Sequence, residues 1–374
     1  MKIGIDASRA FLRRRTGIEE YSYQVIRHLR AELRDQTVVL YVRKKLEIRN
    51  SKLEMTVPDI DFDLPPEWQV KGLWAPRFWT QIRLSLEMLC HAPDVLFVPA
   101  HTVPLIHPRK TVVTVHGLEY EFSPESYGFW ERLYMRWSIR FSVRVADRVI
   151  AVSENTKRDL MRLYAVPEKK IQVIYEGLSQ PTTYNLQPTT ESEPPYFLFI
   201  GRLETRKNIV RMIEAFEIFK AKTGLAHTLV LAGKPGFGYE AIRYKLQATS
   251  YKQDIHELGY VSEEEKWELL KDAEIFLFPS LYEGFGLPVI EAQSVGVPVI
   301  TANTSSLPEV AGEGAVLVNP LDSGEIAEAM EMLVTDPEKR ADIIEEATRN
   351  VDRFGWAQCA KGVAQAVGRP SLSG

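Results

Sequence analysis

The chain repeats one pattern twice: short runs of β-branched and aromatic residues alternate with longer stretches of helical character. Runs of about four to six such residues, ended by Gly, Pro or polar residues, are typical of buried strands. Because strands that alternate with helices favour a parallel sheet covered on both faces, we expect an α/β protein. The predicted strands are 2–5, 37–42, 94–98, 111–115, 148–152 and 171–174 in the first half, and 196–200, 228–232, 255–259, 275–278, 297–301 and 315–318 in the second.

A segment rich in Pro, Thr and Glu, QPTTYNLQPTTESEPP, separates the two repeats and predicts a linker. The length of 374 residues also suits two domains of about 150 residues each. We therefore predict an N-terminal domain at 1–180, a linker at 181–195, a C-terminal domain at 196–355, and a last helix at 356–374 that packs back on the first domain. Doubly wound sheets of this Rossmann-like kind bind ligands beyond the carboxyl ends of their strands, so we expect a site in a cleft between two facing domains.

The composition excludes several classes of protein. Hydrophobic residues make up 45% and charged residues 26%, as in folded globular proteins rather than disordered ones. The two cysteines, Cys90 and Cys359, lie far apart and form no CxxC spacing, which argues against a disulfide framework and a cysteine zinc site. The first residues lack the apolar run of a signal peptide, and no apolar run reaches the length of a membrane-spanning helix. We therefore expect a cytoplasmic protein.

Charge is distributed unevenly along the chain. Residues 1–180 hold 28 basic and 22 acidic residues, whereas residues 181–374 hold 18 and 28. The basic first half predicts contact with something anionic, and a membrane surface or a phosphorylated carrier fits better than nucleic acid. A second interpretation, that the two halves attract each other, stays open.

The segment from Glu274 to Ile300, EIFLFPSLYEGFGLPVIEAQSVGVPVI, gives the strongest chemical signal. It is typical of a strand, a loop, a helix and a second strand. Gly284 and Gly286 allow the loop backbone to approach a ligand closely. The backbone amides of 285–287 begin the helix, whose dipole favours a phosphate group. This segment therefore predicts a phosphate site.

Two carboxylates flank this glycine loop. Glu283 precedes the glycines, and Glu291 lies about one turn into the helix, so the two can reach different parts of one ligand. A carboxylate at the second place can accept both hydroxyls of a ribose, as in dinucleotide sites. The alternative is a strained loop in which the carboxylate only satisfies the protein's own groups.

EGFGLPVIEA resembles the signature of the retaining glycosyltransferases of family four, which have the GT-B fold of two Rossmann-like domains. GRLETRKN, residues 201–208, is similar to the diphosphate-binding stretch of that family. The resemblance implies that Arg202 and Lys207 neutralise the donor diphosphate as the sugar bond breaks, in place of a divalent metal. It further implies that Glu283 holds the donor sugar, that Phe285, Gly286 and Leu287 hold the diphosphate, and that Glu291 holds the ribose.

Other stretches match the same family. The run of arginines at 13–15 and Gly17 lie between the first strand and the first helix, where the family's opening loop approaches the donor. We assign donor contact to Gly17 and leave the arginines to lipid phosphate or to solvent. In GKPGFG, Gly233 approaches the nucleotide. In LGYVSEEE, Tyr260 and Val261 are the expected walls of the base site.

His116 ends the strand TVVTVH and matches the histidine with which the family lines its sugar site. Many relatives follow this histidine with Asp, whereas this chain has Gly117. The DxD pattern at 59–63 resembles a metal motif of another transferase fold, but it lies in a polar stretch between prolines and predicts a solvated loop. Because no His or Cys pair has metal-ligand spacing either, we expect no metal and no cofactor.

The resemblance implies transfer of a hexose from a nucleotide sugar to a hydroxyl of a glycan or lipid-linked acceptor, with retention at the anomeric carbon. The chain is most like bacterial mannosyltransferases of surface-polysaccharide assembly, so GDP-mannose is the first expected donor. UDP-glucose and UDP-N-acetylhexosamine are alternative donors. A sugar-nucleotide epimerase or hydrolase on the same fold, or a non-catalytic assembly component, are alternative functions. We expect peripheral contact with the inner face of the cell membrane and no nucleic acid partner.

Overall fold

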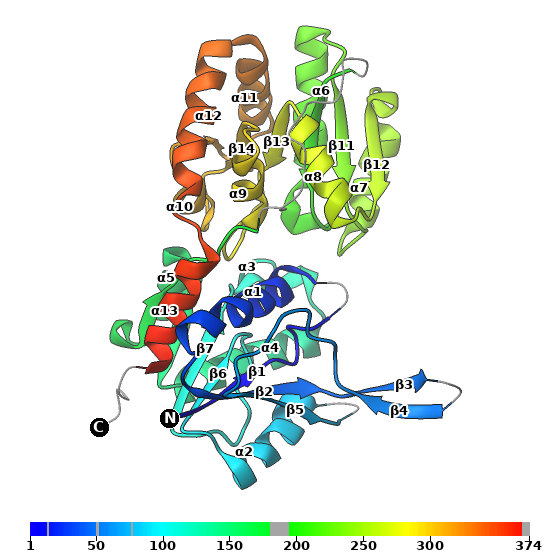
Figure 1. Ribbon diagram of the computed structural model, residues 1–374. Coiled ribbons are helices and arrows are strands. Elements are labelled where there is room, and N and C mark those ends of the chain that lie inside the picture. Colours follow the sequence, from blue (N-terminus) through cyan, green and yellow to red (C-terminus); the bar gives the residue numbers. More distant parts are fainter. Residues whose placement is uncertain (13–14, 50–51, 76–77, 180–193, 369–374) are drawn as a thin grey trace. The chain divides into compact units, whose positions relative to one another are not determined.

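A computed structural model describes the chain except residues 13–14, 50–51, 76–77, 180–193 and 369–374 (Figure 1). The chain forms two compact units. The N-terminal unit comprises 1–118, 129–177 and 355–374, and the C-terminal unit comprises 119–128 and 178–354. The short segment 119–128 thus groups with the C-terminal unit, although the sequence suggested one continuous domain up to residue 180. Most of the predicted linker at 181–195 lies outside the described residues.

The N-terminal unit is built on a seven-stranded sheet with the order β5-β2-β1-β6-β7-β8-β9, in which every pair of neighbours is parallel. Its strands are β1 (Lys2–Asp6), β2 (Thr37–Arg43), β5 (Trp68–Leu73), β6 (Val95–Val98), β7 (Lys110–Val115), β8 (Arg148–Ala151) and β9 (Ile171–Val173). Its helices are α1 (Gly17–Glu32), the π-helix η1 (Trp79–Leu84), α2 (Ser85–His91), α4 (Phe129–Val145), α5 (Glu154–Tyr164), the 3₁₀ turn η3 (Glu168–Lys170) and α13 (Trp356–Gly368).

The six strands predicted in the first half are confirmed, but three further strands lie between β2 and β6. The strands β3 (Lys45–Arg49) and β4 (Lys52–Thr56) form an antiparallel pair, and β5 adds an edge to the sheet beside β2. Their sequences, KLEIR, KLEMT and WQVKGL, interrupt every apolar run with charged or polar residues. The pattern of buried strands therefore does not detect them.

The C-terminal unit has a six-stranded parallel sheet with the order β12-β11-β10-β13-β14-β15. Its strands are β10 (Tyr196–Ile200), β11 (Thr228–Ala232), β12 (Ile255–Gly259), β13 (Ile275–Phe278), β14 (Val299–Ala302) and β15 (Val316–Val318). Its helices are α3 (Glu119–Phe122), α6 (Ile209–Thr223), α7 (Tyr239–Ala248), α8 (Glu263–Asp272), α9 (Leu287–Ser294), α10 (Leu307–Ala311), α11 (Ser323–Thr335) and α12 (Pro337–Val351), with 3₁₀ turns η2 (Pro124–Ser126), η4 (Thr205–Lys207) and η5 (Lys252–Asp254).

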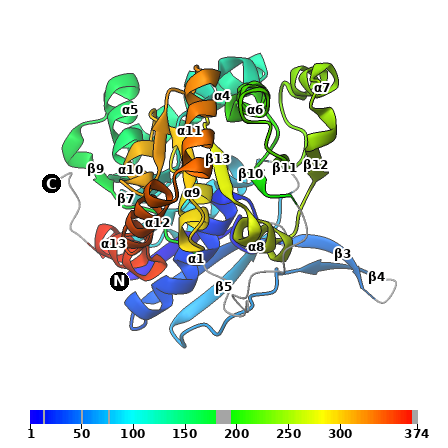
Figure 2. The same cartoon turned by 90° about the horizontal axis from the view of Figure 1, so that it is seen from above.

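All six strands predicted in the second half are present, so the fold class is confirmed as two doubly wound parallel sheets. Helices α6 and α11 pack side by side (Figures 1 and 2). The core of this unit is strongly aromatic. Its fully buried side chains include Phe197, Phe199, Phe216 and Phe276. Their burial explains why the strands of this half read as continuous apolar runs.

In both units the chain starts at a central strand and then winds outward in both directions. In the C-terminal sheet β10 has β11 on one side and β13 on the other, and in the N-terminal sheet β1 lies between β2 and β6. In the C-terminal sheet, the loops after β10 and β13 therefore lead to opposite faces of the sheet. Sheets of this topology bind ligands beyond the carboxyl ends of the strands at this point.

The last helix, α13, belongs to the N-terminal unit and packs against α1. The Trp356 ring lies 6.0 Å from the ring of Tyr21. The approach is close, since a Cβ atom at Gly177 would lie 2.4 Å from the Trp356 backbone nitrogen. The end of the chain therefore completes the unit that its beginning forms.

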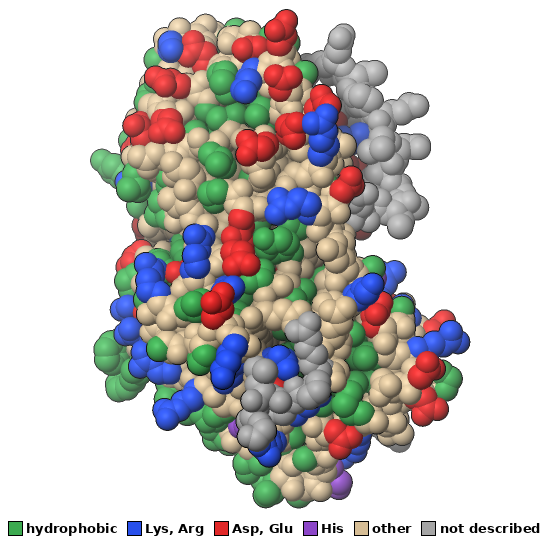
Figure 3. Space-filling model, turned by 90° about the vertical axis from the view of Figure 1, so that its left-hand side faces the viewer, with side chains coloured by type: hydrophobic (Ala, Val, Ile, Leu, Met, Phe, Trp, Pro, Cys, Tyr) green, Lys and Arg blue, Asp and Glu red, His purple; other side chains and the backbone are tan. Residues whose placement is uncertain are grey.

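The surface of each unit reflects the charge difference along the chain. Figure 3 shows many blue basic side chains over the N-terminal unit, in the lower part of the view, and many red acidic ones over the C-terminal unit. Within the described part of the chain, no helix combines the length and apolar character that crossing a membrane requires.

Candidate active site

The loops that follow β10 and β11 are joined backbone to backbone. The Leu203 amide donates to the Lys234 carbonyl at 2.9 Å, and the Gly236 amide donates to the Leu203 carbonyl at 2.8 Å. A Cβ atom at Gly233 would lie only 1.7 Å from the Gly201 carbonyl oxygen. Glycine at 233 is therefore a requirement of the fold at this edge, in addition to any contact with a nucleotide.

Glu283 lies at the centre of a buried ion cluster, which we call the Glu283 cluster. One carboxylate oxygen is 2.5 Å from Lys207 Nζ, and the other is 3.0 Å from an Arg206 guanidinium nitrogen. Arg206 also donates to the Tyr282 carbonyl at 2.6 Å and pairs with Glu204 at 2.8 Å. The cluster therefore connects the loop after β10 to the loop after β13. These two strands are neighbours at the point where the strand order reverses.

Charge dominates the protonation of this cluster. Only 8% of Glu283 is exposed. Burial alone would raise the pKa of Glu283, but the charges of Arg206 and Lys207 outweigh it and lower the pKa to about 2. Burial also lowers the pKa of Lys207, whose ammonium lies 4.7 Å from the centre of the Phe278 ring. Glu283 is therefore ionised at neutral pH.

The structure shows how two of the predicted site residues are held. We predict that Lys207 binds diphosphate beside Arg202 and that Glu283 holds sugar hydroxyls, and the structure adds that Lys207 and Glu283 bind each other. Lys207 is thus a counter-ion of Glu283, and its contact with diphosphate stays a prediction. A carboxylate oxygen has more than one lone pair, so Glu283 can still accept a hydrogen bond from a sugar hydroxyl while both cations hold it in place.

Arg202 differs from Lys207 in its surroundings. It lies two residues after the end of β10, and its side chain is exposed. Its aliphatic part lies against the next loop, because a Cβ atom at Gly236 would be 2.6 Å from Arg202 Cγ. Among the described residues, no carboxylate forms an ion pair with Arg202. Its guanidinium therefore remains available to an anionic ligand.

The turn into α9 has the geometry expected of a phosphate site. Gly286 has φ +122°, and a Cβ atom there would meet Leu307 Cδ2 at 2.9 Å, so glycine is required. Ser306 Oγ lies 2.9 Å from the Glu283 carbonyl oxygen and 2.6 Å from that of Phe285, which fixes the loop. The helix starts at Leu287 and presents amides that no helical carbonyl satisfies.

Glu291 extends from α9 to a lysine of α8. Lys266 Nζ lies 2.8 Å from the Glu291 carboxylate and 2.8 Å from that of Glu263. Burial would lower the pKa of Lys266, but these two carboxylates raise it. Lys266 therefore stays charged and fixes the direction of Glu291, which the sequence predicts to accept ribose hydroxyls.

Tyr260 and Val261 follow β12 at the same edge of the sheet. The Tyr260 ring is largely exposed, and Lys234 Nζ lies 4.6 Å from its centre. Val261 is half-buried. The fold thus brings all the predicted residues of this half to the carboxyl edge of one sheet. Their contact with a base stays a prediction.

His116 ends β7 in the N-terminal unit and is buried. Its Nδ1 lies 2.9 Å from a Glu176 carboxylate oxygen, and its Nε2 lies 2.8 Å from the Pro99 carbonyl oxygen. The Tyr21 ring packs edge-on against the imidazole at 4.5 Å. Both ring nitrogens therefore face acceptors within the protein, and the imidazole is held in one orientation. Its contact with sugar stays a prediction.

Gly17 is the first residue of α1 and is exposed. A Cβ atom built on it meets nothing within 4 Å. The fold therefore does not require glycine here, which leaves ligand approach as the reason we predict. Of the neighbouring arginines, Arg13 and Arg14 lie outside the described residues, and Arg15 pairs with Glu20 at 2.7 Å.

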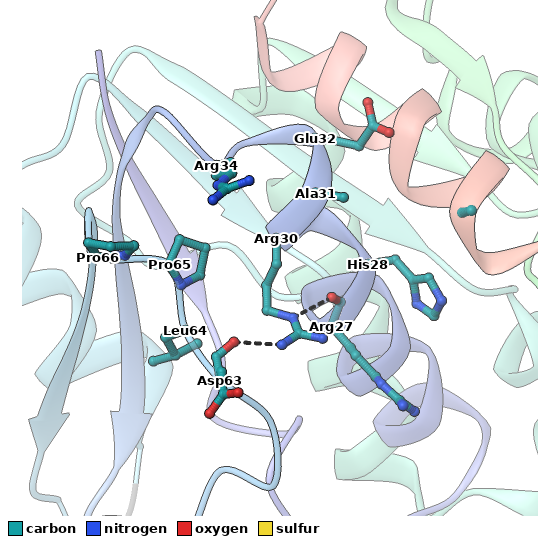
Figure 4. A pocket seen from close by; sticks show the side chains of 11 residues that line it. Arg27, His28, Arg30, Ala31, Glu32, Arg34, Asp63, Leu64, Pro65 and Pro66 are labelled. Carbon is teal, nitrogen blue, oxygen red and sulfur yellow. Dashed lines mark hydrogen bonds between the residues drawn. The ribbon is translucent and has the colours of Figure 1, made fainter.

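The acidic stretch at 59–63 docks onto α1. The Tyr23 hydroxyl donates to the Asp61 carboxylate at 2.8 Å, and Arg30 donates to the Asp63 carbonyl at 2.5 Å. Beside it, α1 and residues 63–66 border an open groove of about 560 Å³ (Figure 4). Across the described residues, no three His, Cys, Asp or Glu side chains gather as metal ligands would.

Three residues of these clusters were missed by the sequence reasoning. Arg206 stands next to Lys207 in ETRKN, so the paired basic residues were a usable signal. Lys266 lies 25 positions from its partner Glu291, and Glu176 lies 60 positions from His116. No local pattern predicts those two pairings, because they arise only when strands and helices are assembled.

Comparison with known proteins agrees with this architecture. Residues 184–350 match the family described as Glycosyl transferases group 1, and residues 15–179 match Glycosyltransferase Family 4. The chain is 29% identical over 261 residues to O-antigen chain mannosyltransferase B of Escherichia coli. This alignment covers 67% of this chain and 68% of that protein. It is 24% identical over 345 residues to O-antigen chain mannosyltransferase RfbU of Salmonella typhimurium, covering 91% and 92%.

The fold also matches solved structures. HepE of Anabaena, solved in complex with UDP and glucose, superposes with a TM-score of 0.69 at 17% identity, covering 99% of both chains. Its likeness concerns the fold alone. The two family matches together span nearly the whole chain. The chain therefore belongs to the family-four glycosyltransferases, which have the GT-B fold.

Proposed function

We propose that the protein transfers mannose from GDP-mannose to a hydroxyl of a glycan or lipid-linked acceptor, with retention at the anomeric carbon and without a metal ion. The observation that carries the proposal is the Glu283 cluster beside the turn into α9, where an ionised carboxylate adjoins a helix N-terminus. The mannosyltransferase relatives, which include two named for the O-antigen chain, support mannose as the sugar.

Each group at the carboxyl edge of the C-terminal sheet has a role in this proposal. Arg202, Lys207 and the first amides of α9 hold the donor diphosphate. Glu291, fixed by Lys266, accepts the ribose hydroxyls. Glu283, fixed by Lys207 and Arg206, accepts hydroxyls of the donor sugar. From the N-terminal unit we propose Gly17 and His116 for contact with the donor.

The proposed reaction breaks the bond between the anomeric carbon and the diphosphate oxygen. The electron pair of that bond stays on the phosphate, whose growing charge Arg202 and the α9 amides stabilise. The acceptor hydroxyl attacks the anomeric carbon from the same face, and its proton passes to the departing phosphate oxygen. The protein thus supplies position and charge stabilisation rather than a covalent nucleophile.

The proposal includes an expected location. The basic N-terminal unit supports peripheral attachment to the inner, anionic face of the cell membrane, where a lipid-carried glycan would be reached from the cytoplasm. We propose that nucleic acid is not a partner of the protein.

A transfer assay tests the proposal. Radiolabelled GDP-mannose, UDP-glucose and UDP-N-acetylglucosamine are each incubated in EDTA with the protein and a membrane extract, and label in the glycolipid fraction is counted. We expect label from GDP-mannose, with an α-linked product by NMR.

Arg202→Ala should lower the rate about 10²–10³-fold without changing the melting temperature. Arg243→Ala, a change of another exposed arginine in the same unit, is the control. A wild-type rate in Arg202→Ala would refute the role of Arg202. Label from a uridine donor only would refute GDP-mannose as the donor.

A further inference from the structure

Helix α4 of the N-terminal unit exposes large aromatic side chains on its outer face. Trp130 is 77% exposed and Phe129 74%, and Leu133, Tyr134 and Trp137 are also exposed. Its buried residues, Ser138, Ile139, Ser142 and Val143, lie on the opposite side of the helix. Burying indole and phenyl rings away from water is favourable, so an outward face of this kind indicates a partner.

The apolar surface continues beyond α4. The loop after β6 contacts both helices: the Val103 amide donates to Ser142 Oγ of α4 at 2.9 Å, and the Ile106 amide donates to Ser85 Oγ of α2 at 3.3 Å. Leu105 and Ile106 of this loop are exposed. Along η1 and α2, further exposed apolar side chains recur at helical spacing: Phe78, Ile82, Leu86 and Leu89. We call these exposed residues of α4, the loop, η1 and α2 the apolar face; all belong to the N-terminal unit (Figure 1).

Positive charge accompanies the aromatic rings on α4. Arg136, Arg140 and Arg144 are exposed, and Leu133, Trp137, Arg140 and Arg144 follow one another at helical spacing. Arg140 lies 5.2 Å from the centre of the Tyr164 ring, and Lys170 donates to the Arg144 carbonyl at 2.8 Å, which adds a further cation. Glu131 is the one acidic residue of the helix. The helix therefore presents rings and cations together.

We propose that this face docks on a bilayer rich in anionic phospholipid, with the rings of α4 at the level of the headgroups and Arg140 and Arg144 bound to phosphates. Trp and Tyr favour that depth because their rings are apolar and their N–H or O–H groups still meet water. Arginine stems bury beside the acyl chains while their guanidinium groups reach the phosphates. Because the exposed charges of α4 are mainly positive, the apolar face favours an anionic partner.

The proposal deepens the membrane part of the proposed function and rests on it for its biological meaning. Vesicle binding is measured without donor or acceptor, however. A protein that binds vesicles but transfers no mannose would overturn the proposed function and leave this surface standing. A protein that transfers mannose in detergent but binds no vesicles would overturn this surface alone.

The experiment is co-sedimentation of the full chain with vesicles of phosphatidylcholine alone and of phosphatidylcholine with 30% phosphatidylglycerol. We expect binding to the anionic vesicles only, weakened by added salt. Arg140→Gln with Arg144→Gln should weaken binding about 25-fold, at about fivefold for each arginine. Trp130→Ser with Trp137→Ser should lower it at least tenfold. The matched controls, Arg243→Gln and Tyr244→Ser on the exposed side of α7, should bind as the wild type does.

Three results would overturn the proposal. One is equal binding to neutral and anionic vesicles, and another is wild-type binding by both α4 variants. The third is a dimer, detected by analytical ultracentrifugation without lipid, that the tryptophan variant abolishes, because the face would then be occupied by a second copy of the chain. Circular dichroism and the melting temperature check that each variant is folded. We expect all of them to fold, because the altered side chains are exposed in the native chain.

Discussion

Replacing Glu283 by Gln tests how the Glu283 cluster is held together. The change keeps the shape of the side chain but leaves Lys207 and Arg206 without their carboxylate. Removing one partner of a buried pair costs about 3–5 kcal/mol. The pKa gives a similar figure: a fall from 4.5 to about 2 corresponds to about 3 kcal/mol of stability at neutral pH. The C-terminal unit should therefore melt roughly 6–12 °C lower.

The same pKa fixes how the loss depends on pH. Because the folded-state pKa is depressed, the contribution of Glu283 is complete above the unfolded value of 4.5 and disappears as the pH falls toward 2. Between pH 7 and pH 4 the difference between wild type and Glu283→Gln should shrink by about 0.8 kcal/mol. Urea unfolding at both pH values measures it. A difference below about 1 kcal/mol at pH 7, or one that grows on acidification, would refute the electrostatic account.

Three further substitutions separate structural from ligand roles. Gly233→Ala should destabilise the C-terminal unit by at least about 2 kcal/mol in urea unfolding, because its Cβ overlaps the Gly201 carbonyl oxygen; unchanged stability would contradict the packing argument. Gly17→Ala should leave the melting temperature unchanged or slightly higher, since its Cβ meets open space, yet raise the KM for the donor; an unchanged KM would remove Gly17 from the site. Glu291→Gln should weaken GDP binding in calorimetry about 10–100-fold, with Glu263→Gln as the control that disturbs the same lysine.

Sequence pattern predicted the fold well where strands are buried on both faces. Strands such as β10 (YFLFI) and β13 (IFLF) have no polar interruption, and their predicted bounds match those of the structure. The edge strand β5 was missed because WQVKGL alternates with polar residues. Edge strands are only partly covered, so their sequences carry a weaker apolar signal.

For the site, sequence could predict the edge of the sheet but not the pairing there. The glycine loop, Glu283 and Glu291 were recognisable because a phosphate-binding turn demands glycine and a helix start. The pairing of Lys207 with Glu283 could not be read, because the two residues are 76 positions apart and meet only across two loops. The same reason hid Lys266 and Glu176. Motifs thus indicated which residues matter, whereas tertiary structure determined which atoms they touch.

The central claim, a metal-free nucleotide-sugar site on the C-terminal unit, is tested most directly by the melting temperature with GDP, UDP and ADP, each with and without EDTA. A ligand at about 100 times its Kd adds roughly 2.7 kcal/mol, which corresponds to a shift of about 5–11 °C for a unit of this size. The account predicts such a shift with GDP, unchanged by EDTA and lost in Arg202→Ala. No shift with any nucleotide, or a shift that EDTA abolishes, would contradict it.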